Sequence, residues 1–365
     1  MDLIKAFDSV DHKVLLRVLA ELGIKGKALD WLTTYINDRY QYVEINNTNK
    51  QYAGKATSRL GKIKFGVPQG SILGPLLFIC YVYRTHKCLD NTRKCALCLF
   101  ADDANLKISG NSSEEIQSTI YSETINVQQY FENLNLQLNF NKTKYLEFKT
   151  KQNRSKSDFQ VEIGNMSIEK VHHAKFLGLT IDSNLSWDEH IRILLKKLNS
   201  GLFALRRMSH LCNLPALKLI YFSYIHSHIA YGISVYGASK EGNLYEILKT
   251  QKQALRIMLN LDYGESVKKY FKELRIMTVF SLYIYETIIY IKMHAPDNIN
   301  YINNHATHSY STRNKGKYIN PKHRLQLYEK KTTYAGRKFF NELRKGMKEI
   351  SNITTHSKRN LKTTC

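Results

Sequence analysis

The segment Phe100-Ala101-Asp102-Asp103 largely decides how this sequence is interpreted. Apolar residues flank it from Cys95 to Ile108, which predicts two short strands joined by a turn at the acids. Two carboxylates at the tip of a buried hairpin repel each other and are costly to desolvate unless a cation accompanies them. A pair of Mg²⁺ ions would satisfy both acids and supply a catalyst of phosphoryl transfer. Considered alone, the dipeptide is explained equally well by a turn that faces solvent.

Two segments upstream of this hairpin carry residues of the kind that such a site uses. Residues 2–12 read Asp2-Leu-Ile-Lys-Ala-Phe-Asp-Ser-Val-Asp-His12 and bring acids to a strand-to-helix junction. Residues 66–75 read Gly66-Val-Pro-Gln-Gly-Ser-Ile-Leu-Gly-Pro75, a rigid turn at the start of an apolar helix. Amide groups at the N-terminus of that helix would face the phosphates or the base of a nucleotide.

The spacing of apolar residues predicts a mixed first half and a helical second half of the chain. Helices are expected over 12–23, 26–37 and 113–134, after 187 to about 294, and near 333–349. Strands are expected as a hairpin within 40–65 and near 144–149, 158–169 and 175–182. Ser112 and Glu115 form a capping box before the third helix. The fold class is therefore α+β, with helices on one face of a largely antiparallel sheet.

The charge balance is strongly basic. Fifty-four Lys and Arg residues against 31 Asp and Glu residues leave a net charge of +23, and residues 301–365 hold fifteen of the cations against three acids. Such an excess attracts a polyanion, most commonly nucleic acid. A solvated basic surface or a peripheral membrane patch remains the alternative.

The sequence predicts an intracellular protein that does not cross a membrane, in the cytoplasm or the nucleus. Six cysteines in 365 residues do not make a disulfide framework, and the first residues are not a signal peptide. The apolar runs at 74–83 and 276–293 are too short, or are interrupted by Glu286, to span a bilayer.

Five motifs in a fixed order give the chain a family resemblance. They are the Asp2–Asp11 segment, the Gly66–Pro75 loop, the Phe-Ala-Asp-Asp hairpin, Leu138-Asn-Phe-Asn-Lys-Thr143, and Lys175-Phe-Leu-Gly178. In this order they resemble the reverse transcriptase of non-LTR retrotransposons of the jockey and related groups. The resemblance continues through 190–237 and, near the C-terminus, Tyr310-Ser-Thr-Arg-Asn314 with Lys322-His-Arg324, so it covers nearly the whole chain.

The resemblance implies a right-hand polymerase architecture and an activity. The palm would comprise residues 1–185, an all-α thumb residues 186–295, and a basic C-terminal region residues 296–365. The implied activity is RNA-directed DNA polymerisation, in which two metal ions transfer a nucleotide to a primer 3′-hydroxyl. Its partners would be an RNA template, a DNA primer and deoxynucleoside triphosphates (dNTPs), and the thumb and the basic tail would hold the RNA/DNA duplex.

The same resemblance implies roles for acids and for one lysine. Asp2 and Asp102 would hold two Mg²⁺ ions, for which Mn²⁺ could substitute, and Asp103 would contribute less. Lys142 would be the general acid that protonates pyrophosphate, although a lone lysine is more often a surface residue. Asp8 and Asp11 are expected to cap the following helix or to bind locally.

Other residues would border the nucleotide and the primer. Phe7 would stack under the incoming sugar and exclude a 2′-hydroxyl, with core packing as the alternative interpretation. Gln69 and Gly70 would border the nucleotide and the template. The segment Phe176-Leu177-Gly178 would press the primer end toward the acids.

The chain also departs from the family pattern. The helix after the glycine-rich loop reads Phe78-Ile-Cys-Tyr-Val-Tyr-Arg84, where relatives usually end in an Asn-Asp pair. Only Met1 precedes Asp2, so an N-terminal truncation without fingers or endonuclease is expected. The second hypothesis is therefore a catalytically inactive remnant that only binds nucleic acid.

Overall fold

A computed structural model describes residues 1–47, 54–89, 94–149, 160–163, 166–294 and 317–343. The chain divides into two compact units, Met1–His172 (unit 1) and His173–Cys365 (unit 2). Each unit has its own apolar core. None of the helices in the described ranges is long and apolar enough to cross a membrane.

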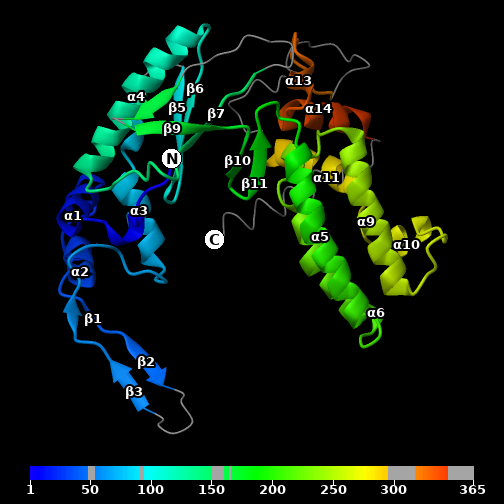
Figure 1. The fold of residues 1–365 in the computed structure, drawn as a ribbon, viewed down its shortest axis with the longest axis horizontal. Helices are drawn as coiled ribbons and strands as arrows, with labels where there is room; N and C mark the ends of the chain where they lie inside the picture. Colours follow the sequence, from blue (N-terminus) through cyan, green and yellow to red (C-terminus); the bar gives the residue numbers. More distant parts are fainter. Residues whose placement is uncertain (48–53, 90–93, 150–159, 164–165, 295–316, 344–365) are drawn as a thin grey trace. The chain divides into compact units, whose positions relative to one another are not determined.

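Unit 1 combines helices with short strands (Figure 1). Its helices are η1 (Ala6–Asp8), α1 (His12–Glu21), α2 (Lys27–Ile36), α3 (Leu73–Val82), η2 (Thr85–Cys88) and α4 (Ser113–Asn133). Its strands are β1 (Tyr40–Gln41), β2 (Glu44–Asn47), β3 (Gly54–Thr57), β4 (Gly61–Lys62), β5 (Cys95–Phe100), β6 (Asp103–Ile108), β7 (Lys144–Leu146), β8 (Val161–Ile163) and β9 (Met166–Val171). The core packs α1, α3 and α4 together through Leu15, Phe78 and Phe131, each of which is fully buried.

The predicted helices of unit 1 are confirmed to within a few residues, because their apolar spacing and end residues agree. The Ser112 side chain accepts a hydrogen bond from the Glu115 amide at 3.2 Å, as the capping box predicts. The Glu115 carboxylate accepts from the Asn111 amide, one residue before the position expected for a complete box.

The predicted antiparallel pairing is largely confirmed, but the strands do not form one sheet. The described strands form separate ladders, β1–β4, β2–β3, β5–β6 and β7–β9–β8, and β7 runs parallel to β9. The segment expected as one strand over 158–169 contains two strands, β8 and β9, which pair antiparallel. Alternation of apolar residues identifies a strand but does not identify its partner, so the pattern could not exclude this arrangement.

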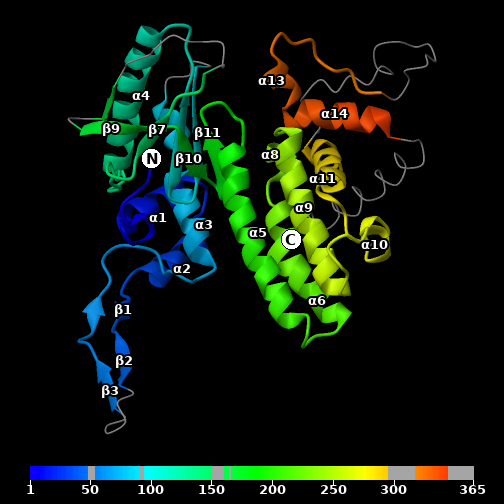
Figure 2. The ribbon, with the colours of Figure 1, turned by 45° about the vertical axis from the view of Figure 1, so that its right-hand side comes forward.

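Unit 2 begins with a hairpin and is otherwise helical (Figure 2). Its elements are β10 (His173–Phe176), β11 (Leu179–Asp182), α5 (Asp188–Met208), α6 (Leu214–Tyr221), the π-helical turn η3 (Phe222–His226), α7 (Ser227–Ala230), α8 (Ile233–Tyr236), α9 (Glu241–Leu259), α10 (Lys268–Glu273), α11 (Val279–His294), α13 (Gln326–Glu329) and α14 (Thr332–Glu342). Helix α5 lies beside α9, and α14 packs on α11. The predicted short helix over 333–349 is α14, and residues 344–349 lie outside the described ranges.

The hairpin β10–β11 packs with the helices that follow it. The Tyr231 hydroxyl donates a hydrogen bond to the Leu177 carbonyl oxygen at 2.6 Å. The Asp182 carboxylate accepts from the amides of Ser186 and Trp187 at 3.0 and 2.7 Å, which fixes the chain where it enters α5. The compact units consequently divide before the hairpin, earlier than the change of pattern near residue 185.

Candidate active site

The first residues of the chain form an extended segment within unit 1. The Met1 nitrogen donates to the Ala104 carbonyl oxygen at 2.8 Å, and the Ala104 amide donates back to Met1 at 3.0 Å. On the other side, Leu3 forms an antiparallel bridge with Leu138. Residues 1–3 are therefore held between β6 and the segment that follows α4.

This backbone pairing aligns Asp2 with the acids of the β5–β6 hairpin. Because Met1 and Ala104 exchange both hydrogen bonds, Asp2 stands opposite Asp103 in the next, closely spaced antiparallel pair. Side chains of such a pair share one face, with Cβ atoms about 5 Å apart. Burial lowers the pKa of the Met1 amino group, while the Asp103 and Asp2 carboxylates oppose that shift, so both acids act on one point.

Two residues form the turn of this hairpin. Phe100 pairs with Asp103, so Ala101 and Asp102 form the loop. Ala101 has a φ of 52°, in the left-handed region that an alanine adopts only at a cost. The tip is less buried than the sequence predicts, because Asp102 is half-buried whereas Phe100 and Asp103 are exposed. Apolar flanks identify the strands, but only one face of this two-stranded ladder packs on the core.

Lys142 lies beside the first acid. Its Nζ atom is 3.3 Å from Oδ2 of Asp2, and the lysine is more exposed than its partner. The turn that carries the lysine is fixed by Asn139, whose carbonyl oxygen accepts from the amides of Lys142 and Thr143. The Asn139 amide donates in turn to the Asp2 carbonyl oxygen at 2.8 Å. Two segments far apart in sequence thus bring an ammonium group to a carboxylate.

The fit of these acids to divalent cations depends on donor type and placement. Carboxylate oxygens are the donors that Mg²⁺ prefers, and Asp2, Asp102 and Asp103 come from adjoining strand ends. As the side chains stand, no three His, Cys, Asp or Glu groups in the described residues converge closely enough to hold one ion. The three acids thus carry the oxygen donors that Mg²⁺ prefers, but their side chains do not form a metal site in this arrangement.

The Gly66–Pro75 loop is tied to the segment that follows Asp2. The Gly66 amide donates to the Val10 carbonyl oxygen at 2.8 Å, and the Val67 amide donates to that of Phe7 at 2.9 Å. Gly66 has a φ of +88°, and a Cβ atom there would lie 2.9 Å from the Asp8 Cα atom. The buried His12 ring adds a contact between Nε2 and the Gly66 carbonyl oxygen at 2.8 Å. Only glycine permits this close approach.

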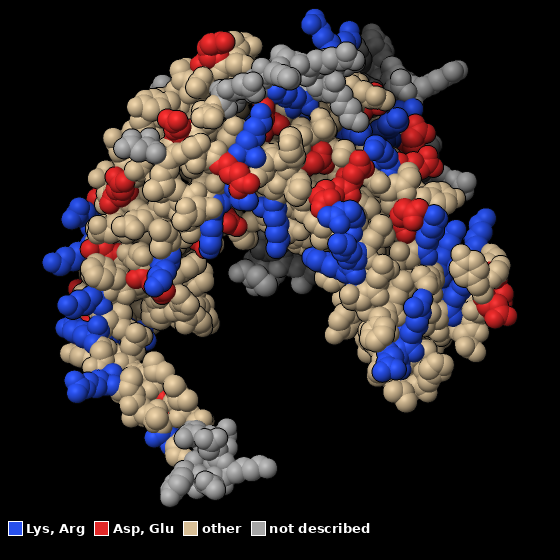
Figure 3. Space-filling view, in the orientation of Figure 1, with Lys and Arg blue, Asp and Glu red and all other residues tan. Residues whose placement is uncertain are grey.

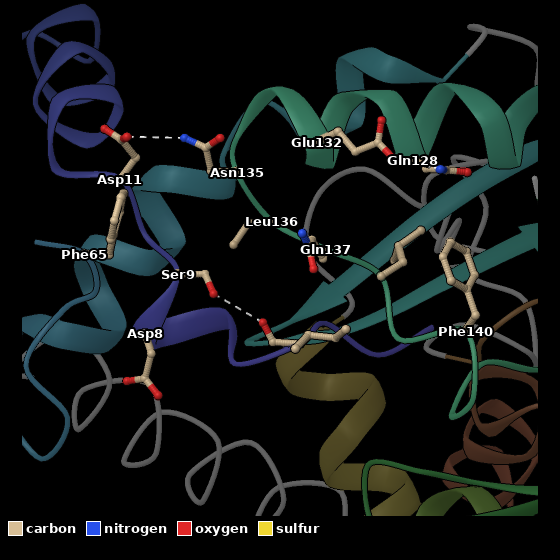
Figure 4. Close-up of a pocket in the computed structure, with 12 residues that line it drawn as sticks. Asp8, Ser9, Asp11, Phe65, Gln128, Glu132, Asn135, Leu136, Gln137 and Phe140 are labelled. Carbon is tan, nitrogen blue, oxygen red and sulfur yellow. Dashed lines mark hydrogen bonds between the residues drawn. The ribbon is translucent and has the colours of Figure 1, made fainter.

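Asp8 and Asp11 have different local roles (Figure 4). Asp11 is the N-cap of α1, because its Oδ1 atom accepts from the amides of Lys13 and Val14 at 2.8 and 3.0 Å. This confirms the capping interpretation for Asp11. Asp8 does not cap α1, and its carboxylate accepts from Nε2 of Gln69 at 2.8 Å. Both acids line a cavity of about 890 Å³ in unit 1.

The residues expected at the nucleotide occupy neighbouring positions on this loop and η1. Phe7 is half-buried, and its ring centroid lies 4.6 Å from that of Phe78, so it packs on the core and keeps part of its surface exposed. Gln69 and Gly70 are exposed, and Gly70 has a φ of +81° with open space around it. The structure thus brings Phe7 and Gln69 together through Asp8.

The sequence did not single out Tyr81, which joins three parts of this frame. Its hydroxyl donates to the Leu134 carbonyl oxygen at 2.5 Å and accepts from the Asp11 amide at 3.2 Å. Burial raises the pKa of Tyr81 to about 12. A tyrosine in an otherwise apolar helix was the available signal, since a buried hydroxyl requires a partner.

The chain is similar in sequence to proteins that are named as RNA-directed DNA polymerases. The chain is 25% identical over 287 residues to the "Probable RNA-directed DNA polymerase from transposon BS" of Drosophila melanogaster, covering 76% of this chain and 30% of that protein. It is 27% identical over 267 residues to the "RNA-directed DNA polymerase from mobile element jockey" of the same species, covering 70% of this chain and 27% of the relative. The chain thus spans less than a third of the length of these relatives.

A family model covers the part of the chain that holds the site. Residues 1–181 match the model described as "Reverse transcriptase (RNA-dependent DNA polymerase)". The matched range contains the three acids, Lys142, the Gly66–Pro75 loop and all but the last residue of the β10–β11 hairpin. Residues 1–181 of this chain therefore belong to the reverse transcriptase family, and the chain resembles the RNA-directed DNA polymerases of non-LTR retrotransposons.

Proposed function

We propose that this chain is an RNA-directed DNA polymerase that transfers nucleotides to a primer 3′-hydroxyl on an RNA template. The observation that carries the proposal is the backbone pairing of Met1 with Ala104, which aligns Asp2 with Asp103 beside the Asp102 turn. Relatives named as RNA-directed DNA polymerases support it. Retention of all three acids favours it over a remnant that only binds nucleic acid.

Asp2, Asp102 and Asp103 would hold two Mg²⁺ ions, or Mn²⁺ in their place. When bound, such ions activate the attacking hydroxyl and stabilise the charge of the triphosphate and of pyrophosphate. The protein contributes the alignment of the acids, because two of them sit on strands whose register is fixed by backbone hydrogen bonds.

Lys142 would act on the leaving group. Its ammonium group is already oriented toward the acids by the pair with Asp2, and it carries protons that pyrophosphate could accept. The same positive charge would offset the negative charge that develops on the leaving oxygen. Lys142 thus serves as proton donor and as electrostatic stabiliser.

Phe7, Gln69 and Gly70 would border the incoming dNTP. The exposed part of Phe7 would lie under the sugar, where a ring leaves little room for a 2′-hydroxyl. Gln69 is anchored by Asp8, so it is oriented before a ligand binds. The adjoining groove is basic, since Arg39, Lys62 and Lys64 line it with Gln69, and this charge suits template phosphates.

We assign the palm to residues 1–185, the thumb to 186–295 and a basic C-terminal region to 296–365. The segment Phe176-Leu177-Gly178 would guide the primer end from the β10–β11 turn. Exposed cations on α5 would contact the backbone of the RNA/DNA duplex, and they include Lys196, Lys197, Arg206 and Arg207. The basic tail would add contacts that do not depend on base sequence.

The test is primer extension on poly(A) with oligo(dT), in Mg²⁺ and in Mn²⁺. We expect extension by the full chain that is abolished by Asp102→Asn. A matched control is Asp30→Asn, which removes one exposed acid on α2 and should leave extension unchanged. If the chain binds the primer-template but extends nothing under either ion, the remnant hypothesis is correct.

A further inference from the structure

A second candidate binding site lies entirely within unit 2. A cavity of about 870 Å³ lies between the segment 322–333, the beginning of α5, and the helices α8 and α11. Its lining residues are Ile181, Leu185, Trp187, Val235, Tyr290, Lys322, His323, Arg324, Leu325, Leu327, Tyr328, Lys330, Lys331, Thr332 and Thr333. None of the reactions assigned to the acids of unit 1 uses these residues.

The walls of this cavity are apolar and remain accessible. Leu325 is 54% exposed, Leu327 is 40% exposed and Tyr290 is 38% exposed. Trp187 forms a buried wall at the N-cap of α5. Apolar side chains gathered around a concave surface of this size are typical of a ligand site rather than of ordinary surface.

The permanent charges that line the cavity have one sign. Four permanent cations line the cavity, namely Lys322, Arg324, Lys330 and Lys331, and none of its described lining residues is an Asp or Glu. Figure 3 shows Lys and Arg side chains, with Asp and Glu side chains among them, over the part of unit 2 that holds α13 and α14. A ligand that suits this site therefore combines an apolar, flat body with negative charge.

The lining segment is fixed in place, so the cavity exists before a ligand binds. The Thr332 hydroxyl donates to the Ser234 carbonyl oxygen at 2.7 Å, which ties the start of α14 to α8. The His323 and Tyr328 rings stack with centroids 5.6 Å apart, and His323 contacts Glu329 at 3.0 Å. These contacts hold the His323 and Tyr328 rings in place on either side of the exposed Leu325 and Leu327.

We propose that this cavity binds an unpaired nucleotide of single-stranded RNA. The base would rest against Leu325, Leu327 and Tyr290, and the flanking phosphates would contact the four cations. A base within a duplex is stacked and paired, so only an unpaired nucleotide presents both features to the cavity. The site goes beyond the polymerase chemistry, and its occupancy does not depend on the acids of unit 1.

The experiment measures binding of the full chain to labelled RNA by fluorescence anisotropy. The probes are a single strand of about twelve nucleotides, an abasic ribose-phosphate strand of the same length, and vesicles that contain phosphatidylserine. One variant combines Lys322→Ala with Arg324→Ala, and a second is Leu325→Asn. The matched control combines Lys268→Ala with Lys269→Ala, which removes two exposed charges on α10 outside the cavity.

The proposal predicts a separate result for each variant. The cavity charge variant should lower the slope of log affinity against log salt by about 1.4, from about 0.7 for each of two cations. Leu325→Asn should weaken RNA binding about tenfold and leave binding of the abasic strand unchanged. The control pair should change neither quantity, and Asp102→Asn should retain full RNA binding.

Three results would overturn the proposal. The first is a cavity charge variant that behaves like the α10 control. The second is a Leu325→Asn variant that weakens binding of the RNA and of the abasic strand equally. The third is a cavity charge variant that loses vesicle binding without losing RNA binding, which would assign the cavity to an anionic lipid. Leu327→Asn provides an independent apolar variant if Leu325→Asn does not fold.

Discussion

The Lys142 ammonium lies 3.3 Å from an Asp2 carboxylate oxygen, although 140 residues separate them in sequence. The pair is partly exposed, so it is worth no more than about 1 kcal/mol to stability. Its value for the proposed mechanism is positional, because it holds the Lys142 ammonium group beside the acids. Loss of activity on changing Lys142 would therefore not be explained by unfolding.

Lys142→Ala is expected to slow nucleotide incorporation about 100-fold, since a general acid contributes that much or more. The loss should appear in kcat rather than in KM, as measured by single-nucleotide incorporation. Lys142→Arg retains the charge but donates a proton poorly, so it should restore little activity. Lys144→Ala is the control, because Lys144 pairs with Glu169 at 3.0 Å instead. Equal rates for Lys142→Ala and Lys144→Ala would contradict the assignment.

Tyr81→Phe is expected to destabilise unit 1 by about 1–3 kcal/mol. The substitution removes the hydrogen bond to the Leu134 carbonyl oxygen and leaves the Asp11 amide without its acceptor. Urea-induced unfolding followed by circular dichroism measures the change. Tyr121→Phe is a suitable control because Tyr121 is 60% exposed on α4. A midpoint for Tyr81→Phe that matches the control would show that these hydrogen bonds contribute no net stability.

Much of the secondary structure could be predicted from the sequence because the signals are local. Apolar spacing with Ser112 at its start predicts α4, and an acid before an apolar run predicts the Asp11 cap. Strand partners could not be predicted, since pairing is decided by tertiary contacts. The parallel β7–β9 ladder is one example. The exposure of Asp103 at the hairpin tip also depends on tertiary contacts and could not be predicted.

In the candidate site as well, residue types could be predicted from the sequence whereas contacts between distant segments could not. Residue types identify the acids and the Gly66–Pro75 loop, because carboxylates and glycines in that spacing serve specific chemistry and backbone geometry. Contacts such as Gln69 with Asp8, or Tyr81 with Leu134, join segments more than fifty residues apart. No pattern along the chain encodes those pairs.

Stability is expected to fall at alkaline pH through buried tyrosines. Burial raises the pKa values of Tyr81, Tyr221 and Tyr283 from 10.0 to about 12 in the folded chain. Their contribution is fully present below pH 10, where both states are protonated, and is lost as pH rises through 12. Between pH 10 and 12, each of these tyrosines lowers the free energy of unfolding by about 1.4 kcal/mol for every pH unit. Denaturant unfolding at a series of pH values measures the slope, which Tyr221→Phe should reduce by one group. An unchanged slope in that variant would contradict the assignment.

Gly66→Ala is expected to destabilise unit 1 by at least about 2 kcal/mol, because two costs combine. The φ of +88° is unfavourable for any residue with a Cβ atom, and that atom would lie 2.9 Å from the Asp8 Cα atom, where backbone cannot yield cheaply. The matched control is Gly242→Ala in α9, where no atom lies within 4 Å of the new Cβ. Alanine favours a helix, so the control should gain up to about 1 kcal/mol, the opposite sign. Urea denaturation of both variants tests the pair.

Displacement of the loop should also impair primer extension by Gly66→Ala, since Gln69 would lose its alignment with Asp8. A Gly66→Ala protein as stable as the unmodified chain would show that the loop does not depend on this close approach.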